Sequence, residues 1–265
     1  MSDITASKKT TASKGSRFLG VTSIAGVLIL LLFAFIFTDP DIRIHPETGK
    51  EYGQFDAVRL LYLHVPLAVI TYLAYVLCAI ASAGYLFKKT RWWDAFAHSC
   101  AEVGTLTCGL VLLTGSIWGR PVWNTWWEWG DVRLMSTLIL FLLFLGYLAL
   151  RKSVVSPQKA ARPAAVVALI AVLDIPLINR SVEWWENRTL HQKSTLSELK
   201  IEDLTLFTLV LGMIVIGIVV AWLILHRFRI AWLEWADFEH GVKMAIEERL
   251  EESKVRDPRD GEGKR

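Results

Sequence analysis

The sequence predicts an all-α integral membrane protein with six transmembrane helices. Of its 265 residues, 53% are hydrophobic and only 21% are charged, and the mean hydropathy is +0.39. The apolar residues are gathered in blocks long enough to cross a bilayer, with short polar stretches between them. An ordinary soluble domain of this size is much less apolar. The net charge of +3 is weak and forms no basic stripe, which argues against a nucleic-acid-binding protein.

The chain divides into a membrane domain and two tails. Residues 1–17 are rich in Ser, Thr and Lys without apolar periodicity, and we expect a disordered cytoplasmic tail. Residues 18–226 form the membrane domain, and residues 227–265 a charged cytoplasmic tail whose apolar start suits a short surface helix. A signal peptide is not expected, because the first apolar run is long enough to span and has no small-residue cleavage site. The six spans are expected at about 18–38, 57–87, 95–117, 134–150, 163–179 and 204–226.

The distribution of Lys and Arg predicts the orientation of these spans. With six spans, the basic N-terminal tail, residues 88–91, residues 151–162 and the pair Arg227/Arg229 all fall on one side of the membrane. Cytoplasmic loops carry the excess of Lys and Arg, so that side is expected to be cytoplasmic, with both termini inside. The segment between the third and fourth spans is then extracytoplasmic.

That segment is unusually rich in tryptophan. Residues 118–131 contain five indoles: Trp118, Trp123, Trp126, Trp127 and Trp129. Trp123, Trp126 and Trp127 are spaced i, i+3 and i+4, which predicts a short helix with three indoles on one face. Pro121 would suit the first turn of that helix. Such a surface suits a large planar ligand. The alternative is an aromatic belt at the membrane surface, where Trp is commonly enriched.

Two histidines on the same predicted side are candidate ligands for a metal. His64 lies in Tyr-Leu-His-Val-Pro, about seven residues into the second span, which is roughly 10 Å below the surface. Ionisable side chains at such depth are costly and are often functional. His191 lies in the third outer loop, near Trp184 and Trp185. Two imidazoles beside aromatic segments could ligate the iron of a planar porphyrin. Alternatively, His64 hydrogen-bonds a neighbouring helix and His191 is a solvated loop residue.

Cations and one carboxylate extend the candidate site. Porphyrin carboxylates need positive partners, and Arg binds carboxylates through two parallel hydrogen bonds. Asp174 lies at nearly the depth of His64 and could accept a hydrogen bond from an imidazole N–H, a frequent partner of a ligating histidine. The sequence contains no nucleotide-binding loop, no nucleophile motif and no CxxC pair, so no catalytic residue is predicted. The candidate arginines near the outer face are Arg59, Arg120, Arg133, Arg180 and Arg188.

At these residues the chain resembles the CcmC family, membrane proteins that handle haem during cytochrome c maturation. The resemblance is carried by the Trp-rich segment 118–131, His64 with its neighbours, Asp174-Ile-Pro and Thr-Leu-His191-Gln, and it extends over residues 18–226. The chain departs from the family pattern in two ways. Gly130 separates Trp129 from Asp131, where the family has Trp-Asp directly, and the C-terminal tail is longer than usual.

The resemblance implies a specific role. The protein would hold haem b non-covalently at the periplasmic face of the bacterial inner membrane, with His64 and His191 as axial ligands of the iron and the Trp-rich segment as a platform. It would present haem to the chaperone CcmE, beside the ABC-type pair CcmA/CcmB and the small membrane protein CcmD. The implied role is that of a binding and delivery component rather than a stand-alone enzyme.

Two other functions remain compatible with the residues. One is a b-type electron-transfer subunit, although such proteins usually pair histidines from neighbouring spans and His191 lies in a loop. The other is a transporter of a different small molecule, with the tryptophans serving only as an interfacial belt. A haem absorption band in the purified protein would exclude the second, and redox cycling with a quinone would favour the first.

Overall fold

The computed structural model describes residues 14–154, 156–191 and 203–256, and within them six helices are long and apolar enough to cross a membrane. The predicted six-helix fold class is therefore confirmed. The first span joins α1 to a π-helical turn, the second begins with a 3₁₀ turn, and the fifth consists of two helices. The helices are α1 (Lys14–Leu32), η2 (Phe33–Phe37), η3 (Asp56–Leu60), α2 (Leu61–Lys88), α3 (Arg91–Trp123), α4 (Val132–Ser153), α5 (Pro157–Ala171), α6 (Asp174–Trp184), η4 (Glu186–Arg188) and α7 (Asp203–Arg256).

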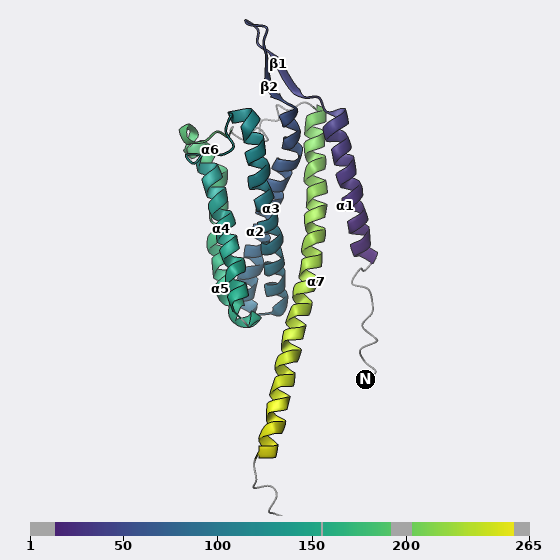
Figure 1. Cartoon of the computed structure of the whole chain (residues 1–265), viewed down its shortest axis with the longest axis vertical. Coiled ribbons are helices and arrows are strands. Elements are labelled where there is room, and N and C mark those ends of the chain that lie inside the picture. Colours follow the sequence, from purple (N-terminus) through teal and green to yellow (C-terminus); the bar gives the residue numbers. More distant parts are fainter. Residues whose placement is uncertain (1–13, 155, 192–202, 257–265) are drawn as a thin grey trace, which may run out of the picture.

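Helices α2 and α3 form the centre of the bundle (Figure 1). Helices α4 and α5 pack on one side of this pair, α7 packs on the other, and α1 packs against α7. In the core, the ring of Tyr75 stacks on Phe144 with a centroid distance of 3.7 Å. The three cysteines, Cys78, Cys100 and Cys108, are buried in the same core and unpaired, as expected of small apolar fillers.

The contact between α2 and α7 is unusually close because of two residues. Pro66 in α2 has no N–H to donate to the carbonyl of Tyr62, yet the helix continues through it. Gly212 of α7 lies against this position. A Cβ added at Gly212 would lie 2.6 Å from the backbone carbonyl oxygen of Tyr62 and 2.9 Å from Cγ of Pro66. The glycine therefore lets α7 approach the start of α2, where one of the candidate histidines is located.

Two features were not expected from the sequence. The polar loop after the first span contains an antiparallel hairpin of β1 (Asp41–Ile44) and β2 (Glu51–Phe55), which projects from one end of the bundle (Figure 1). The fifth span is broken between α5 and α6, because Pro176 cannot donate a hydrogen bond to the carbonyl four residues earlier.

The C-terminal region also differs from the expectation of a short surface helix followed by disorder. Helix α7 has 54 residues and continues without a break to Arg256. At ~1.5 Å per residue it is about 80 Å long, well beyond the ~30 Å hydrocarbon thickness of a bilayer. Its last part leaves the bundle (Figure 1). The segment beyond Arg227 contains no proline before Arg256 and many good helix formers, which explains the continuation. Residues 1–13 and 257–265 of the predicted tails lie outside the described residues.

Candidate functional site

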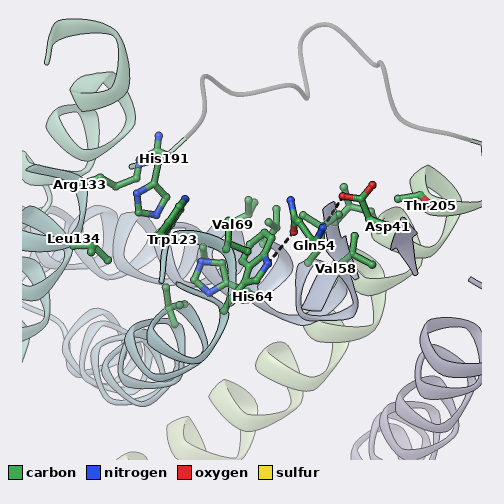
Figure 2. Close-up of a pocket in the computed structure, with 18 of the residues that line it drawn as sticks. Asp41, Gln54, Val58, His64, Val69, Trp123, Arg133, Leu134, His191 and Thr205 are labelled. Atoms are coloured by element: carbon green, nitrogen blue, oxygen red, sulfur yellow. Dashed lines mark hydrogen bonds between the residues drawn. The ribbon is translucent and has the colours of Figure 1, made fainter. Parts of the chain in front are cut away.

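A cavity of about 980 Å³ opens at the end of the bundle that carries the hairpin. This volume is at the upper end of the range of about 300–1,000 Å³ for small-molecule sites. The hairpin, η3, α2, α3, α4, α6 and the start of α7 all contribute to the lining (Figure 2). Its walls combine aliphatic and aromatic side chains with many polar and charged ones. Those polar groups include both candidate histidines, His64 and His191.

His64 lies in the first turn of α2 and faces α3. Its Nδ1 is 3.0 Å from Oγ1 of Thr114. The Thr114 hydroxyl donates its one hydrogen to the carbonyl of Leu110, at 2.8 Å, so it accepts from His64. This assigns the hydrogen of the neutral ring to Nδ1 and leaves a lone pair on Nε2. The ring meets Trp118 edge to face, with centroids 5.5 Å apart, and Trp118 donates to Gln54 of β2 at 3.0 Å.

His191 lines the same cavity from the loop that follows η4. Its ring meets Trp123 edge to face, with centroids 4.8 Å apart. Its Nδ1 lies 3.4 Å from Oδ2 of Asp131. An ionised carboxylate only accepts hydrogen bonds, so in the neutral ring Nδ1 carries the hydrogen and Nε2 keeps the lone pair. Figure 2 shows Trp123 between the two imidazoles. Each histidine is thus oriented by a partner at Nδ1, and among the described residues no hydrogen bond occupies its Nε2.

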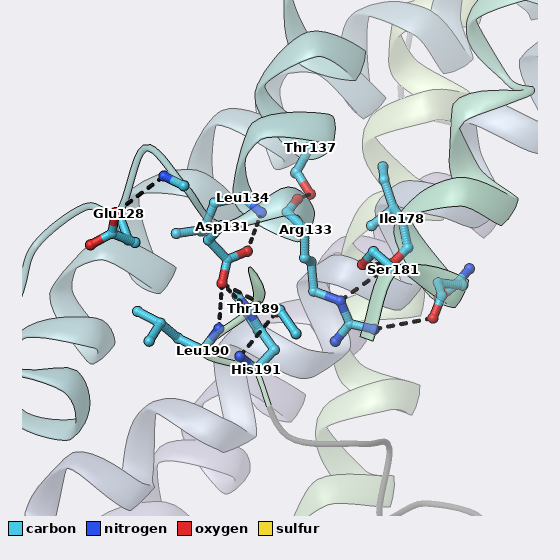
Figure 3. Close-up of polar contacts among 12 residues, drawn as sticks. Glu128, Asp131, Arg133, Leu134, Thr137, Ile178, Ser181, Thr189, Leu190 and His191 are labelled. Atoms are coloured by element: carbon cyan, nitrogen blue, oxygen red, sulfur yellow. Dashed lines mark hydrogen bonds and ion pairs between the residues drawn. The ribbon is translucent and has the colours of Figure 1, made fainter. Parts of the chain in front are cut away.

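Asp131 is the polar centre of the region around His191 (Figure 3). It is the N-cap of α4 and accepts from the backbone N–H of Leu134 at 2.9 Å. It also accepts from the N–H of Leu190 at 2.6 Å. Burial alone raises the pKa of this carboxyl, but the hydrogen bonds from His191, Leu134 and Leu190 outweigh it and lower the pKa to about 2. Asp131 is therefore ionised at neutral pH. In the sequence it stands out only as the last residue of the Trp-rich segment, although an Asp directly before a span is a typical N-cap.

The five tryptophans do not share one surface. Trp118 and Trp123 line the cavity, whereas Trp126, Trp127 and Trp129 do not. The predicted helical face is wrong, because α3 continues to Trp123 and ends there with Asn124 in the left-handed conformation. Pro121 accordingly lies in the last turn of α3 rather than in a first turn. Trp126 and Trp129 are 57% and 72% exposed.

The candidate arginines fall into two groups, those that line the cavity and those that do not. Arg133 lines the cavity, and its hydrogen bonds to described residues are two long ones of 3.4 Å, to the carbonyls of Ile178 and Asn179. Arg180 lines it too and is paired with Glu183 at 2.7 Å. The other candidates, Arg59, Arg120 and Arg188, are not among the residues that line the cavity.

The positions of Arg59 and Arg120 have a local explanation. Arg59 donates to the carbonyls of Ala34 and Thr38 at the end of the first span. Arg120 donates to the carbonyl of Asn124 at 2.6 Å and so closes the end of α3.

Asp174 does not have the position suggested for it. It begins α6 and is not among the residues that line the cavity. Among the described residues its Oδ2 is buried without a hydrogen-bond partner. The carboxylate that contacts an imidazole is Asp131 instead. The interruption of the fifth span explains why Asp174 is not among the residues that line the cavity, because it places Asp174 at the start of α6.

Comparison with known proteins identifies the family. A family model described as "CcmC: Heme exporter protein C" matches residues 9–239. The chain belongs to the CcmC family. It is 38% identical over 189 residues to the heme exporter protein C of Bradyrhizobium diazoefficiens, covering 69% of this chain and 68% of that protein. It is 34% identical over 185 residues to the heme exporter protein C of Escherichia coli K12, covering 70% of each.

A mitochondrial relative is similar over a shorter range. A putative cytochrome c biosynthesis ccmC-like mitochondrial protein of Marchantia polymorpha is 37% identical over 149 residues, covering 56% of this chain and 61% of that protein. Membership of the CcmC family supports a role in haem handling for cytochrome c maturation, by a multi-pass membrane protein that works with other Ccm components. In this CcmC chain, the cavity contains two oriented imidazoles, a type of side chain that binds haem iron.

Proposed function

We propose that this CcmC chain binds haem b non-covalently in the cavity, with His64 and His191 as the axial ligands of the iron. One observation carries the proposal: both imidazoles line the same cavity, and each has its Nδ1 hydrogen-bonded so that Nε2 is available. Ligating histidines in proteins are typically held in this way. The chemistry that bound haem supplies is coordination of its iron by two neutral imidazoles. The role of the protein is to bind, orient and release it.

The remaining lining suits the rest of a porphyrin. Trp118 and Trp123 offer apolar aromatic walls next to the two imidazoles. We assign Arg133 to a propionate, because its guanidinium lines the cavity and its 3.4 Å bonds to two carbonyls leave it able to form a stronger, charge-assisted pair. Arg59 and Arg120 donate to backbone carbonyls and are not among the residues that line the cavity, so the geometry supports them less.

The charges of the bundle support a periplasmic location of the cavity. Basic residues gather at the opposite end, where α2 meets α3 and α4 meets α5, and this end is cytoplasmic by the Lys/Arg rule. The cavity would then open at the outer face of the inner membrane. The basic residues in these two connections and helix ends are Lys88, Lys89, Arg91, Arg151, Lys152 and Lys159.

The exposed aromatic residues beside the cavity support a role in haem delivery. We propose that the chain presents haem to CcmE, in a complex with CcmA/CcmB and CcmD. Exposed Trp126 and Trp129 lie in the segment next to the cavity wall, and Trp residues are enriched at protein–protein interfaces. No activated nucleophile is present among the described residues that line the cavity, which favours presentation of haem over covalent catalysis.

Absorption spectroscopy of the purified protein tests this proposal. The wild-type protein is expected to show a Soret band with the spectrum of six-coordinate haem. The single variants His64→Ala and His191→Ala should change the ligation, and the double variant should lose most of the haem. His45→Ala is the matched control, because His45 lies in the hairpin turn, bonded to the N–H of Glu47, and does not line the cavity. A double variant with the wild-type spectrum would overturn the ligand assignment.

A further inference from the structure

One carboxylate joins two segments that are far apart in the sequence. Oδ1 of Asp131 accepts from the N–H of Leu134 and so caps α4. Oδ2 of the same side chain accepts from three consecutive residues of the loop after η4: the hydroxyl of Thr189 at 3.2 Å, the N–H of Leu190 at 2.6 Å and Nδ1 of His191 at 3.4 Å. Its side chain is fully buried. One oxygen thus caps α4, and the other binds the loop (Figure 3).

In the described structure, this loop makes few other contacts that hold it in place. Within the described part of the chain, the hydrogen bonds that Thr189, Leu190 and His191 make to other elements all end at Asp131. The remaining bond, from the N–H of His191 to the Thr189 hydroxyl, is internal to the loop. The edge-to-face contact with Trp123 adds packing but no hydrogen bond. Within the described residues, one carboxylate oxygen therefore accepts all the hydrogen bonds that tie this loop to other elements.

We propose that Asp131 is the positioning residue for the His191 ligand: it fixes the loop over the cavity and directs Nε2 of His191 inward. The inference rests on the proposed function, since it concerns a ligand of haem. According to this inference, the two ligands are held in place in different ways. His64 belongs to a packed helix and needs its Thr114 partner only to orient the ring. His191 needs Asp131 for both its place and its orientation, and the anionic acceptor makes its imidazole the stronger donor to a metal.

Two substitutions separate the loop contacts from the helix cap. Asp131→Ser keeps a good N-cap for α4 but lacks the second oxygen that binds the loop. Asp131→Asn keeps the volume and one oxygen, and places an NH₂ group where three donors point. Asp174→Asn is the control, because this half-buried carboxylate starts a neighbouring helix and hydrogen-bonds neither histidine in the described structure. Thermal unfolding of each purified variant reports whether the fold is retained.

The expected result is a loss confined to the His191 side. Both Asp131 variants should bind haem about 10- to 100-fold more weakly than wild type, the usual effect of removing a partner of a ligating histidine. Their spectra should match that of His191→Ala, and added imidazole should restore the six-coordinate spectrum in all three. In a double-mutant cycle, Asp131→Ser should cost nothing further in the His191→Ala background, whereas it should add to His64→Ala.

The outcomes distinguish this inference from the proposed function. If Asp131→Ser weakens haem binding equally with and without His191, the residue acts through the fold and the inference is overturned. The inference is also overturned if His191→Ala changes the spectrum while Asp131→Ser and Asp131→Asn do not. If His191→Ala itself leaves the spectrum of the haem-loaded protein unchanged, the proposed function fails and the inference fails with it.

Discussion

Gly115 of α3 lies against Cε1 of the His64 imidazole. A Cβ added at Gly115 would be 2.9 Å from Cε1 of that ring, closer than real Cβ atoms approach a neighbour. The next residue toward the start of α3, Thr114, holds Nδ1 of the same ring. One turn of α3 therefore supplies both the surface on which His64 rests and the hydrogen bond that orients it.

Gly115→Ala is expected to displace His64 and to alter the haem spectrum. The methyl group has no room, and overpacking of this kind costs about 1–3 kcal/mol. Gly146→Ala is the control, because a Cβ at that position in α4 meets nothing within 4 Å. It should leave the spectrum unchanged and stabilise α4 by about 0.5–1 kcal/mol through reduced chain entropy. Haem titration and thermal unfolding of the two variants measure these effects, and equal haem affinity would contradict the packing argument.

Thr114→Val should weaken haem binding while preserving volume. It removes the acceptor for the Nδ1 hydrogen of His64, and a half-buried donor without a partner costs about 1–3 kcal/mol. Thr114→Ser retains the hydroxyl and should remain close to wild type. The comparison is made by haem titration. If the Val and Ser variants bind haem equally, the hydrogen bond does not contribute to orienting the ligand.

Replacing Trp126 and Trp129 together with Ala should slow transfer of haem to CcmE without changing the spectrum of bound haem. Both indoles are exposed and outside the cavity lining. Exposed aromatic anchors of an interface often contribute about 2 kcal/mol or more, so a decrease of roughly 30-fold in transfer is expected. The measurement is covalent loading of purified CcmE. Trp92→Ala, at the other end of the bundle and 46% exposed, serves as the control. A changed spectrum in the double variant would place the two indoles in the haem site instead.

Breaking the ion pair between Asp94 and Arg151 should destabilise the bundle and leave the haem site intact. The pair is bidentate, with N–O distances of 2.5 and 2.8 Å, and lies at the end opposite the cavity. The side chains are 3% and 8% exposed, so Arg151→Met leaves a buried charge at a cost of about 3–5 kcal/mol. Replacing both residues with apolar ones should restore much of the loss. Thermal unfolding in detergent checks the order of stabilities; a single variant as stable as wild type would contradict it.

Much of the fold could be predicted because a membrane span is a local property. About 20 consecutive apolar residues suffice to recognise it, whatever the rest of the chain does. The hairpin of β1 and β2 was not predicted, since its strands have only four and five residues and are mostly exposed, and the alternation of Ile42 and Ile44 in β1 is too short to stand out. The continuation of α7 was missed for a related reason, because a charged sequence is compatible with a solvated helix as well as with disorder.

Residue spacing failed where tertiary structure set the boundary of an element. The i, i+3, i+4 pattern of Trp123, Trp126 and Trp127 implied a helical face, but α3 ends at Trp123. Asp174 and His64 have similar predicted depths, yet depth alone does not say which sides of two helices face each other. The carboxylate beside His191 is Asp131, which is 60 positions away in the chain.

By itself the sequence determined the number of spans, the chemical type of the candidate ligands and the resemblance to haem-handling proteins, since hydrophobicity and residue identity are readable one segment at a time. Only the tertiary structure decided that His64 and His191 line one cavity, that Trp118 and Trp123 accompany them while the other indoles do not, and that Asp131 holds the loop. These relations depend on helix packing and on hydrogen bonds between segments distant in the chain, and no local pattern encodes which donor will meet which acceptor.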